Sequence, residues 1–202
     1  MIQDPETPPR APGLDDVRRA LGSRRPETVP GCRAAVAVVC CERAGALHLL
    51  FIESAQRAGD PWSGHLAFPG GRLEAVDPGP RAAAERETRE EVGLDLGPEE
   101  YLGRLDDLAT VTTSMRVAAF VYGIAGPRPP RIGDEVEEAF WYPLAELLDP
   151  ERQALREFEH RGERDFWPSI DLRRPGSPFL WGVTYRFVGH LAELLGRPLP
   201  GA

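Results

Sequence analysis

The sequence predicts an α/β or α+β sandwich of one domain, in which a mixed β-sheet packs between helices. Two features lead to this fold class. Short runs rich in β-branched and aromatic residues alternate with longer segments whose apolar residues recur every three or four positions. The chain also has 202 residues, of which 42% are hydrophobic, and this is enough apolar material for one sizeable core.

The first part of the chain reads as a helix followed by a β-rich region. We expect a short helix over residues 13–24, capped by Asp15. The apolar runs 33–42 and 46–54, separated by the sequence RAGA, predict a hairpin or two neighbouring strands. The run LAFPGGRL, residues 66–73, predicts a short strand that turns at two glycines.

The segment with the strongest helical signals covers residues 77–94. Pro80 suits the first helical turn, three alanines follow it, and Gly93 stands at the expected C-terminal stop. Further strands are expected at residues 106–114, 116–124 and 139–144, a helix should begin within 144–149, and another helical pattern covers 179–196.

The domain organisation follows from these elements. We expect an N-terminal extension with a short helix over residues 1–30 and the main domain over residues 31–198. Residues 151–178 are polar and irregular and give no assignment. A substrate lid or specificity loop and a plain surface excursion remain open interpretations of that segment.

The charge balance excludes some classes of partner. The net charge of −8 disfavours a broad nucleic-acid-binding surface, because such a chain repels phosphate backbones at long range.

There is no apolar run long enough to span a membrane and no signal-peptide pattern, so we expect a cytoplasmic protein. The three cysteines, Cys32, Cys40 and Cys41, have no zinc-site spacing and suit a reducing compartment.

The stretch RETREEVGL concentrates like charges at the C-terminal end of the best helix. Glu87, Glu90 and Glu91 are spaced to lie side by side, where like charges and the helix dipole both disfavour them. A solvated face, neutralised in part by Arg86, explains the pattern in one way. A site for Mg²⁺ or Mn²⁺ explains it in another, since hard divalent cations prefer carboxylate and carbonyl oxygens. Spacing alone leaves the two interpretations balanced.

A longer sequence pattern around these glutamates favours the metal site over the solvated face. The segment GGRLEAVDPGPRAAAERETREEVGL resembles the Nudix box of the Nudix hydrolases, usually written G-x5-E-x7-R-E-U-x-E-E-x-G-U, where U is a bulky aliphatic residue. The matching positions are Gly71, Arg86, Glu87, Glu90, Glu91, Gly93 and Leu94. The departures are Asp77 in place of the first glutamate, eight residues instead of seven before Arg86, and Thr88 in place of the aliphatic residue. These departures put the role of Asp77 in doubt.

The resemblance implies a Nudix fold and a set of site residues. It implies that Glu87 and Glu91 are the main ligands of Mg²⁺ or Mn²⁺, and that the Gly70 carbonyl completes the coordination. Glu90 would bind a further ion or support the set, and Arg86 would orient a glutamate. A general base is expected from a box glutamate or from the acidic loop that holds Glu135, Glu137 and Glu138, with Glu135 as the first choice.

The resemblance also implies a substrate class. Nudix enzymes cleave a diphosphate linked to another moiety, so the expected partner is a small nucleoside diphosphate derivative. The pair Leu49-Leu50, the sequence FPGG at residues 68–71, and the late element Trp181-Gly182-Val183-Thr184 resemble the coenzyme A pyrophosphatase branch. That branch would yield 3′,5′-ADP and 4′-phosphopantetheine. The resemblance also suggests a homodimer, since many relatives are dimers.

Several alternatives stay open. ADP-ribose, a nucleotide sugar or a dinucleoside polyphosphate would keep the chemistry and change the substrate. A non-catalytic Nudix-like ligand-binding module and an isomerase of the same fold would change the class. Side chains considered for phosphate or base contacts, against surface or core roles, are Arg57, His65, Arg116, Trp62 and Trp141.

Overall fold

A mixed β-sheet forms the centre of the molecule. The computed structural model of this chain describes residues 10–56, 64–110, 115–160 and 163–200. Among these residues, the central strands β1 (Ala34–Arg43) and β7 (Arg116–Ile124) run parallel, and all other pairs in the sheet are antiparallel. The remaining strands of this sheet are β2 (Ala46–Ser54), β3 (Leu66–Ala67), β4 (Gly70–Arg72), β5 (Glu100–Arg104), β6 (Leu108–Ala109) and β8 (Val136–Pro143).

The strands β1 and β2 pair over only part of their length. Their register joins Cys40–Arg43 to Ala46–Leu49, and beyond that point the two strands diverge. β3 then pairs with β2, and β4 pairs with the start of β1. The short segment that carries the sequence FPGG therefore bridges the gap between the two strands, and this places Gly70 at the edge of the sheet where the site is found.

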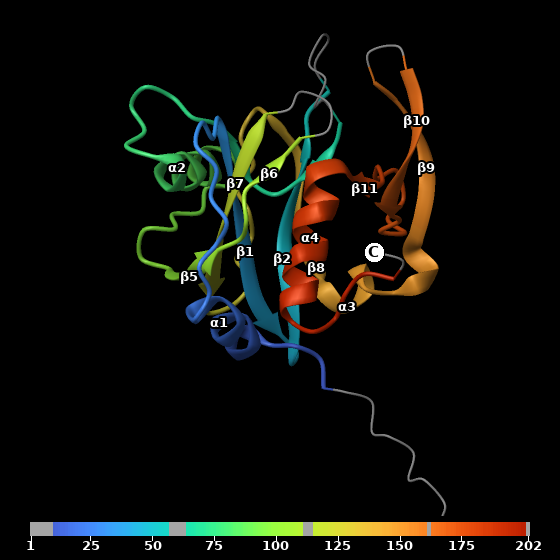
Figure 1. The fold of residues 1–202 in the computed structure, drawn as a ribbon, viewed down its shortest axis with the longest axis horizontal. Coiled ribbons are helices and arrows are strands. Elements are labelled where there is room, and N and C mark those ends of the chain that lie inside the picture. The colour runs from blue at the N-terminus through green and yellow to red at the C-terminus, as the bar shows by residue number, and fades with distance from the viewer. Residues whose placement is uncertain (1–9, 57–63, 111–114, 161–162, 201–202) are drawn as a thin grey trace, which may run out of the picture.

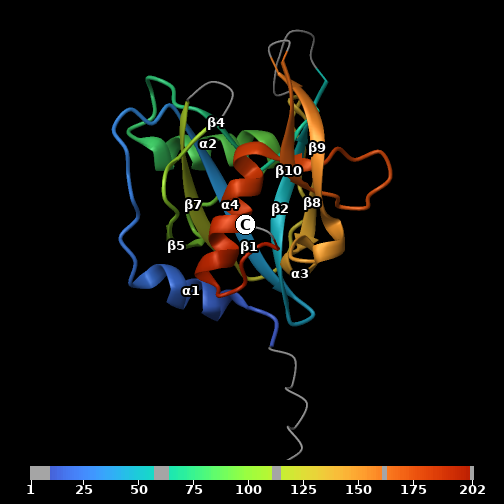
Figure 2. The same cartoon turned by 45° about the vertical axis from the view of Figure 1, so that its right-hand side comes forward.

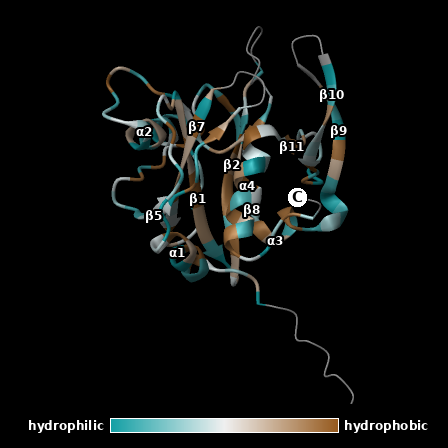
Figure 3. Ribbon diagram, in the orientation of Figure 1, coloured by the Kyte–Doolittle hydropathy of each residue, from teal (hydrophilic) through white to brown (hydrophobic). Residues whose placement is uncertain are grey.

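Helices cover both faces of the sheet, as the fold-class prediction required. Figures 1 and 2 show α2 (Pro80–Val92) on one face and α4 (Gly182–Leu194) on the other. Alternate residues of β1 enter two different apolar clusters: Val38 packs on the side of α4, and Val39 packs on the side of α2. Because β1 is buried on both faces, its sequence is an almost continuous apolar run. Figure 3 shows this run and its counterpart in β7 as brown strands.

Two smaller helices close the ends of the sandwich. α1 (Leu14–Gly22) buries Val17 and Leu21 against the sheet, and α3 (Leu144–Leu147) follows β8 directly. The expectation that Asp15 caps α1 is wrong. Gly13 holds the cap position, and its N–H donates to the carboxylate of Asp16 at 2.9 Å. Asp15 instead pairs with Arg18 one turn later.

The segment left unassigned by sequence folds as a hairpin. β9 (Gln153–His160) follows a short 3₁₀ turn, η1 (Pro150–Arg152), and pairs with β10 (Glu163–Ile170), which in turn pairs with β11 (Leu180–Trp181). Figure 2 shows this hairpin standing beside α4. These strands form a second, three-stranded sheet, so the segment is not an irregular loop. Its role, as a specificity element or as a surface excursion, is not decided by the fold alone.

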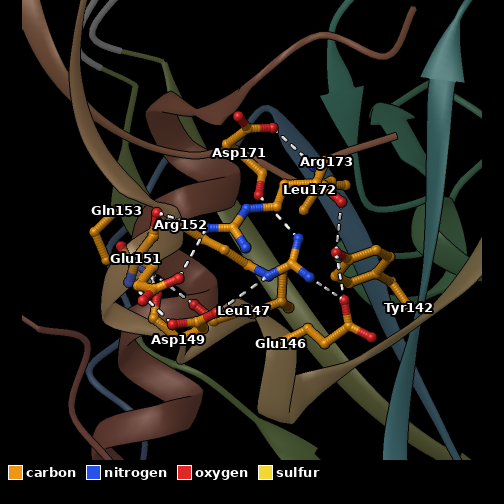
Figure 4. Close-up of polar contacts among 10 residues, drawn as sticks. All are labelled: Tyr142, Glu146, Leu147, Asp149, Glu151, Arg152, Gln153, Asp171, Leu172 and Arg173. Atoms are coloured by element: carbon orange, nitrogen blue, oxygen red, sulfur yellow. Dashed lines mark hydrogen bonds and ion pairs between the residues drawn. The ribbon is translucent and has the colours of Figure 1, made fainter. Parts of the chain in front are cut away.

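A polar cluster holds the base of the hairpin (Figure 4). The Tyr142 hydroxyl donates to the carbonyl of Leu172 at 2.7 Å and lies 3.0 Å from the Glu146 carboxylate. Arg152 pairs with Glu146 and also donates to the carbonyl of Asp171 at 3.3 Å. These contacts join β8, α3 and the two ends of the hairpin, so the hairpin is held to the main sheet by polar groups on three different segments.

Two sequence expectations concern the boundaries of the structure. The strand expected at residues 106–114 is found only as β6, and residues 111–114 lie outside the described part of the chain. The division of the chain at residue 30 stays a prediction. Within the described residues, the helices are all too short or too polar to cross a membrane.

Candidate functional site

The helix α2 presents opposite faces to the sheet and to the site. Ala83, Ala84, Thr88 and Val92 are buried against the sheet. Thr88 replaces the bulky aliphatic residue of the Nudix pattern, and its hydroxyl donates to the Ala84 carbonyl at 2.7 Å. The buried hydroxyl is therefore satisfied within its own helix, and the substitution leaves the packing face intact.

The C-terminal end of α2 holds the loop that follows β7. Gly93 ends the helix in the left-handed conformation with φ 68°, as its place in the pattern predicted. The last carbonyls of a helix have no partner inside it. Here the N–H of Arg131 donates to the Val92 carbonyl and the N–H of Gly133 donates to the Glu91 carbonyl, both at 2.9 Å. These bonds bring Glu135, which is distant in sequence, to the end of the helix.

Three glutamates of α2 and the end of this loop line one cavity of about 340 Å³. We call it the acidic cavity, and its lining residues are Glu87, Glu90, Glu91, Gly133, Asp134 and Glu135. The structure therefore brings together the three box glutamates and Glu135. Glu137 and Glu138, the other carboxylates weighed for the general base, do not line it.

Glu91 is the most buried carboxylate of the acidic cavity. Its carboxylate accepts the N–H of Gly70 at 2.8 Å. Its pKa is raised to about 8, mainly by burial; the hydrogen bond from Gly70 opposes this shift, and the charges of Glu87, Glu135 and Glu90 contribute to it. Burial also raises the pKa of Glu87, although Arg86 opposes that shift. These carboxylates are thus held together against their mutual repulsion.

Arg86 is fixed by Asp77, the residue whose role the sequence left in doubt. The guanidinium donates to both oxygens of Asp77, at 3.1 and 3.0 Å, and to the carbonyl of Arg72 at 3.2 Å. This pairing, with a second hydrogen bond from the Glu74 N–H, holds the pKa of Asp77 below its usual range. The extra residue in the preceding loop therefore does not displace this carboxylate from the arginine.

The remaining nitrogen of Arg86 turns to the glutamates. It lies 3.1 Å from an oxygen of Glu87 and 3.1 Å from an oxygen of Glu90. The side chains of Arg86 and Glu87 are 15% and 17% exposed, so solvent screens their contact little, whereas Glu90 is 56% exposed and its contact is open to solvent. Arg86 therefore contacts two of the box glutamates, and its role in orienting a glutamate stays a prediction.

Two glycines let the chain approach the carboxylates closely. Gly70 has φ 150°, and a Cβ there would collide with the backbone of Ala35 and Val36. A Cβ on Gly71 would collide with the carboxylate of Glu87. The bond observed at Gly70 is the one from its N–H to Glu91, and the metal role expected for its carbonyl stays a prediction.

The donor chemistry of the acidic cavity fits a hard divalent cation. Every side chain that could bind a metal ion in this cavity offers carboxylate oxygens. Arg86 supplies a positive charge to two of these side chains, Glu87 and Glu90. Across the described residues, however, no three acidic, histidine or cysteine side chains form a ready-made metal centre. The cavity thus supplies suitable ligands that have not converged on one point.

The other predicted contact residues lie elsewhere. His65 packs edge-on against Trp181, with ring centroids 5.2 Å apart, and Arg116 is exposed at the start of β7. Trp141 packs beside the apolar cluster under α2, and its indole N–H donates to the Arg128 carbonyl at 3.0 Å. Arg57 and Trp62 lie outside the described residues.

Cys40 and Cys41 do not provide a catalytic nucleophile. Cys40 and Cys41 are fully buried in β1, and burial raises the pKa of Cys41 to about 11. A thiol of this kind is almost entirely protonated near neutral pH, so it is inert. The isomerase alternative, which needs a catalytic cysteine, finds no support in these two residues.

The fold and this site define a class of protein: an α+β sandwich whose glycine turn and glutamate helix form an acidic cavity at one edge of a mixed sheet. The NUDIX domain family model matches residues 32–162. The chain therefore belongs to the Nudix family of hydrolases, as the resemblance of its box predicted.

Comparison with known proteins supports the same family. The chain is 32% identical over 166 residues to the human mitochondrial coenzyme A diphosphatase NUDT8, covering 80% of this chain and 69% of the human protein. It is 31% identical over 195 residues to the Nudix hydrolase NudL of Citrobacter koseri, covering 92% of this chain and 96% of NudL. It is also 38% identical over 115 residues to a Schizosaccharomyces pombe protein, C14C4.10c, but covers only 35% of that protein's length and 52% of its own.

A solved structure of an Ap4A hydrolase from C. elegans is similar with a TM-score of 0.46 and 19% sequence identity, over 56% of this chain and 81% of that chain.

Proposed function

We propose that this chain is a divalent-metal-dependent pyrophosphatase that hydrolyses coenzyme A to 3′,5′-ADP and 4′-phosphopantetheine. The observation that carries the chemistry is the acidic cavity, in which four glutamates share one space beside a fixed arginine. Such an arrangement is unfavourable unless a cation compensates it. A bound diphosphate adds further negative charge and makes that requirement stronger.

Glu87, Glu90, Glu91 and the Gly70 carbonyl would hold Mg²⁺ or Mn²⁺. When bound, the metal would neutralise the diphosphate oxygens and lower the pKa of the attacking water. The protein's own contribution is to hold these ligands in place. Gly70 fixes Glu91 through a backbone N–H, and Arg86, clamped by Asp77, fixes Glu87 and Glu90.

Glu135 is the proposed general base. It enters the acidic cavity from the loop that α2 holds, opposite the box glutamates. In the reaction, water attacks one phosphorus of the diphosphate in line with the bridging oxygen. The bond from that phosphorus to the bridging oxygen breaks, and the proton of the attacking water passes to Glu135. Each product keeps one phosphate of the cleaved diphosphate, and 3′,5′-ADP also keeps the 3′-phosphate of coenzyme A.

The support for coenzyme A comes from sequence similarity to the human diphosphatase, which extends over 80% of this chain. It therefore includes segments outside the residues that match the family model. The Leu49-Leu50 pair, the FPGG turn and the late Trp-Gly-x-Thr element also resemble the coenzyme A branch. None of these features excludes other nucleoside diphosphate derivatives on physical grounds, and the assay must compare them.

The test is a substrate panel with the purified chain and Mg²⁺ or Mn²⁺, containing coenzyme A, ADP-ribose, a sugar nucleotide and a dinucleoside polyphosphate. We expect coenzyme A to have the highest kcat/KM and to yield 3′,5′-ADP and 4′-phosphopantetheine by mass spectrometry. Hydrolysis of ADP-ribose to AMP without cleavage of coenzyme A would overturn the substrate assignment. Equal activity with EDTA in place of metal would overturn the metal dependence.

A further inference from the structure

A second cavity lies next to the acidic cavity and differs from it in chemistry. Its volume is about 100 Å³, and its apolar walls include Leu66, Ala67, Trp167, Trp181 and Val183. No described residue that lines it is a lysine, arginine, aspartate or glutamate. We call it the apolar cavity. A space of this volume holds roughly three water-sized groups.

The aromatic wall of the apolar cavity is held in place by neighbouring rings. Trp181 stacks on Phe158 of β9, with ring centroids 4.0 Å apart and planes 7° from parallel. The ring of His65, the residue directly before β3, meets Trp181 edge-on. Trp167 lines this cavity and Phe158 packs on its Trp181 wall, while Leu155 and Phe166 of the same strands are exposed.

The turn into α4 completes the wall. Trp181 pairs with Ser169 at the end of β11, and Gly182, with φ 66°, directs the chain at once into the helix. A side chain is strained in this left-handed conformation, which explains the glycine in the Trp-Gly-x-Thr element. Val183, the next residue, then points into the cavity wall.

Two chain segments connect the apolar cavity to the acidic one. Ser54 lines the apolar cavity, and the N–H of the next residue, Ala55, donates to the carbonyl of Glu135 at 2.9 Å. Ala67 also lines it, and three residues later Gly70 donates to Glu91. Three residues of extended chain span about 10 Å. Ala67 and Gly70 are therefore at most about 10 Å apart, a separation that a diphosphate with an attached arm is long enough to span.

The apolar cavity is not formed by the Nudix domain alone. The family model ends at residue 162, and half of the lining residues, including Trp167, Trp181 and Val183, come after it. The catalytic carboxylates all lie inside the matched region. The apolar wall is thus an addition to the domain that carries the chemistry, as expected of a part that selects the substrate.

We propose that the apolar cavity binds the uncharged arm attached to the diphosphate, and that Trp181 and Val183 are specificity-determining residues. This inference rests on the proposed function. In coenzyme A the arm is pantetheine, whose thiol end is small, flexible and uncharged. The other end of coenzyme A carries a 3′-phosphate, which requires cationic partners that the described walls of this cavity lack.

The test fills the cavity with Val183→Phe and compares it with Val76→Phe. Val76 is 76% exposed and lies outside both cavities, so it is a matched control for the same change. We expect Val183→Phe to raise the inhibition constant of 4′-phosphopantetheine by roughly tenfold or more, because the inserted ring takes the space of the terminal group. The inhibition constant of 3′,5′-ADP should change less than twofold, and the control should change neither.

A second variant removes the wall instead of filling it. Trp181→Leu should weaken 4′-phosphopantetheine in the same direction, and calorimetric titration of this compound gives a readout that does not depend on turnover. Loss of affinity for both products in equal measure, or for neither, in folded variants would overturn the inference. A wild-type chain that does not cleave coenzyme A would instead overturn the proposed function, and that result is seen before any variant is made.

Discussion

The acidic cavity and the apolar cavity lie close together but are assembled in opposite ways. Two short stretches of chain, one turn of α2 and the residues Gly133–Glu135, supply all the lining of the acidic cavity. The apolar cavity collects residues from β2, β3, β10, β11 and α4, between Ser54 and Thr184. The acidic cavity is thus formed by two short segments that hydrogen bonds hold in place, whereas the apolar cavity depends on the packing of many segments.

This difference indicates a division of roles. Carboxylates that must share a cation need fixed spacing, which one helical turn supplies whatever the rest of the chain does. A pocket that selects one uncharged group needs only shape and apolar surface, which many segments can supply. Substitutions in the acidic cavity should therefore abolish turnover, while substitutions around the apolar cavity should change the choice of substrate or the stability of the fold.

The largest effect is expected for Glu91→Gln. The amide keeps the shape of the side chain but removes a proposed metal ligand, so kcat should fall by ~10³-fold or more, which corresponds to ~4 kcal/mol of transition-state stabilisation. The matched control is Glu85→Gln on the same helix. Glu85 contacts Arg81 and Tyr122 outside the cavity, so its variant should keep near-wild-type turnover. Substantial activity in Glu91→Gln would contradict the assignment of Glu91.

The next effect separates Glu135 from its neighbours in the acidic loop. Glu135→Gln should lower kcat by ~10²-fold with little change in KM, since a general base contributes in the transition state. Glu137→Gln is the control, because Glu137 is exposed on β8 and does not line the acidic cavity. Steady-state kinetics on coenzyme A would check both. Equal losses in the two variants would mean that the acidic loop acts through its overall charge.

A smaller loss is expected when the clamp on the glutamates is loosened. Arg86→Lys keeps the charge but cannot donate to both oxygens of Asp77, so the glutamates lose their fixed orientation. Turnover should fall by ~10–100-fold, and the dissociation constant for Mn²⁺, measured by electron paramagnetic resonance, should rise by a similar factor. Arg89→Lys, an exposed change on the same helix, should alter neither quantity. A fall in turnover with unchanged Mn²⁺ affinity would contradict a positioning role.

The contrast between locally determined and packing-determined parts also explains which elements of the fold the sequence could predict. α2, β1, β2 and β7 appear close to their expected bounds, because each carries a strong periodic or continuous apolar signal. The hairpin of β9 and β10 was not predicted. Its outer face exposes Leu155 and Phe166 beside charged residues, so the usual alternation of apolar and polar positions is lost. The hairpin is recognised only in the structure, from the pairing of β9 with β10.

The site shows the same limit at the scale of single residues. The three glutamates and Arg86 could be predicted because one helix fixes their spacing. The clamp by Asp77 was doubted, because an extra residue in a loop changes spacing without necessarily changing position in space. Trp167 was not singled out, and Val183 was named only as part of the late Trp-Gly-x-Thr element, since no local pattern distinguishes a residue that lines a pocket from one that fills the core.

The smallest effect concerns the anchor that holds the hairpin, and with it the wall of the apolar cavity. Tyr142→Phe removes the hydroxyl that donates to the Leu172 carbonyl, a donor that stays protonated because burial raises the pKa of Tyr142 to about 12. The free energy of unfolding should fall by ~1 kcal/mol, which corresponds to a fall in Tm of ~3 °C. Tyr101→Phe is the control, since its hydroxyl makes no hydrogen bond within the described residues and its loss should leave Tm unchanged. Because the Tyr142 cluster and the acidic cavity share no residue, kcat for coenzyme A should stay within twofold of wild type while KM rises. An equal fall in kcat would show that the two cavities are mechanically coupled, and the division of roles between them would then fail.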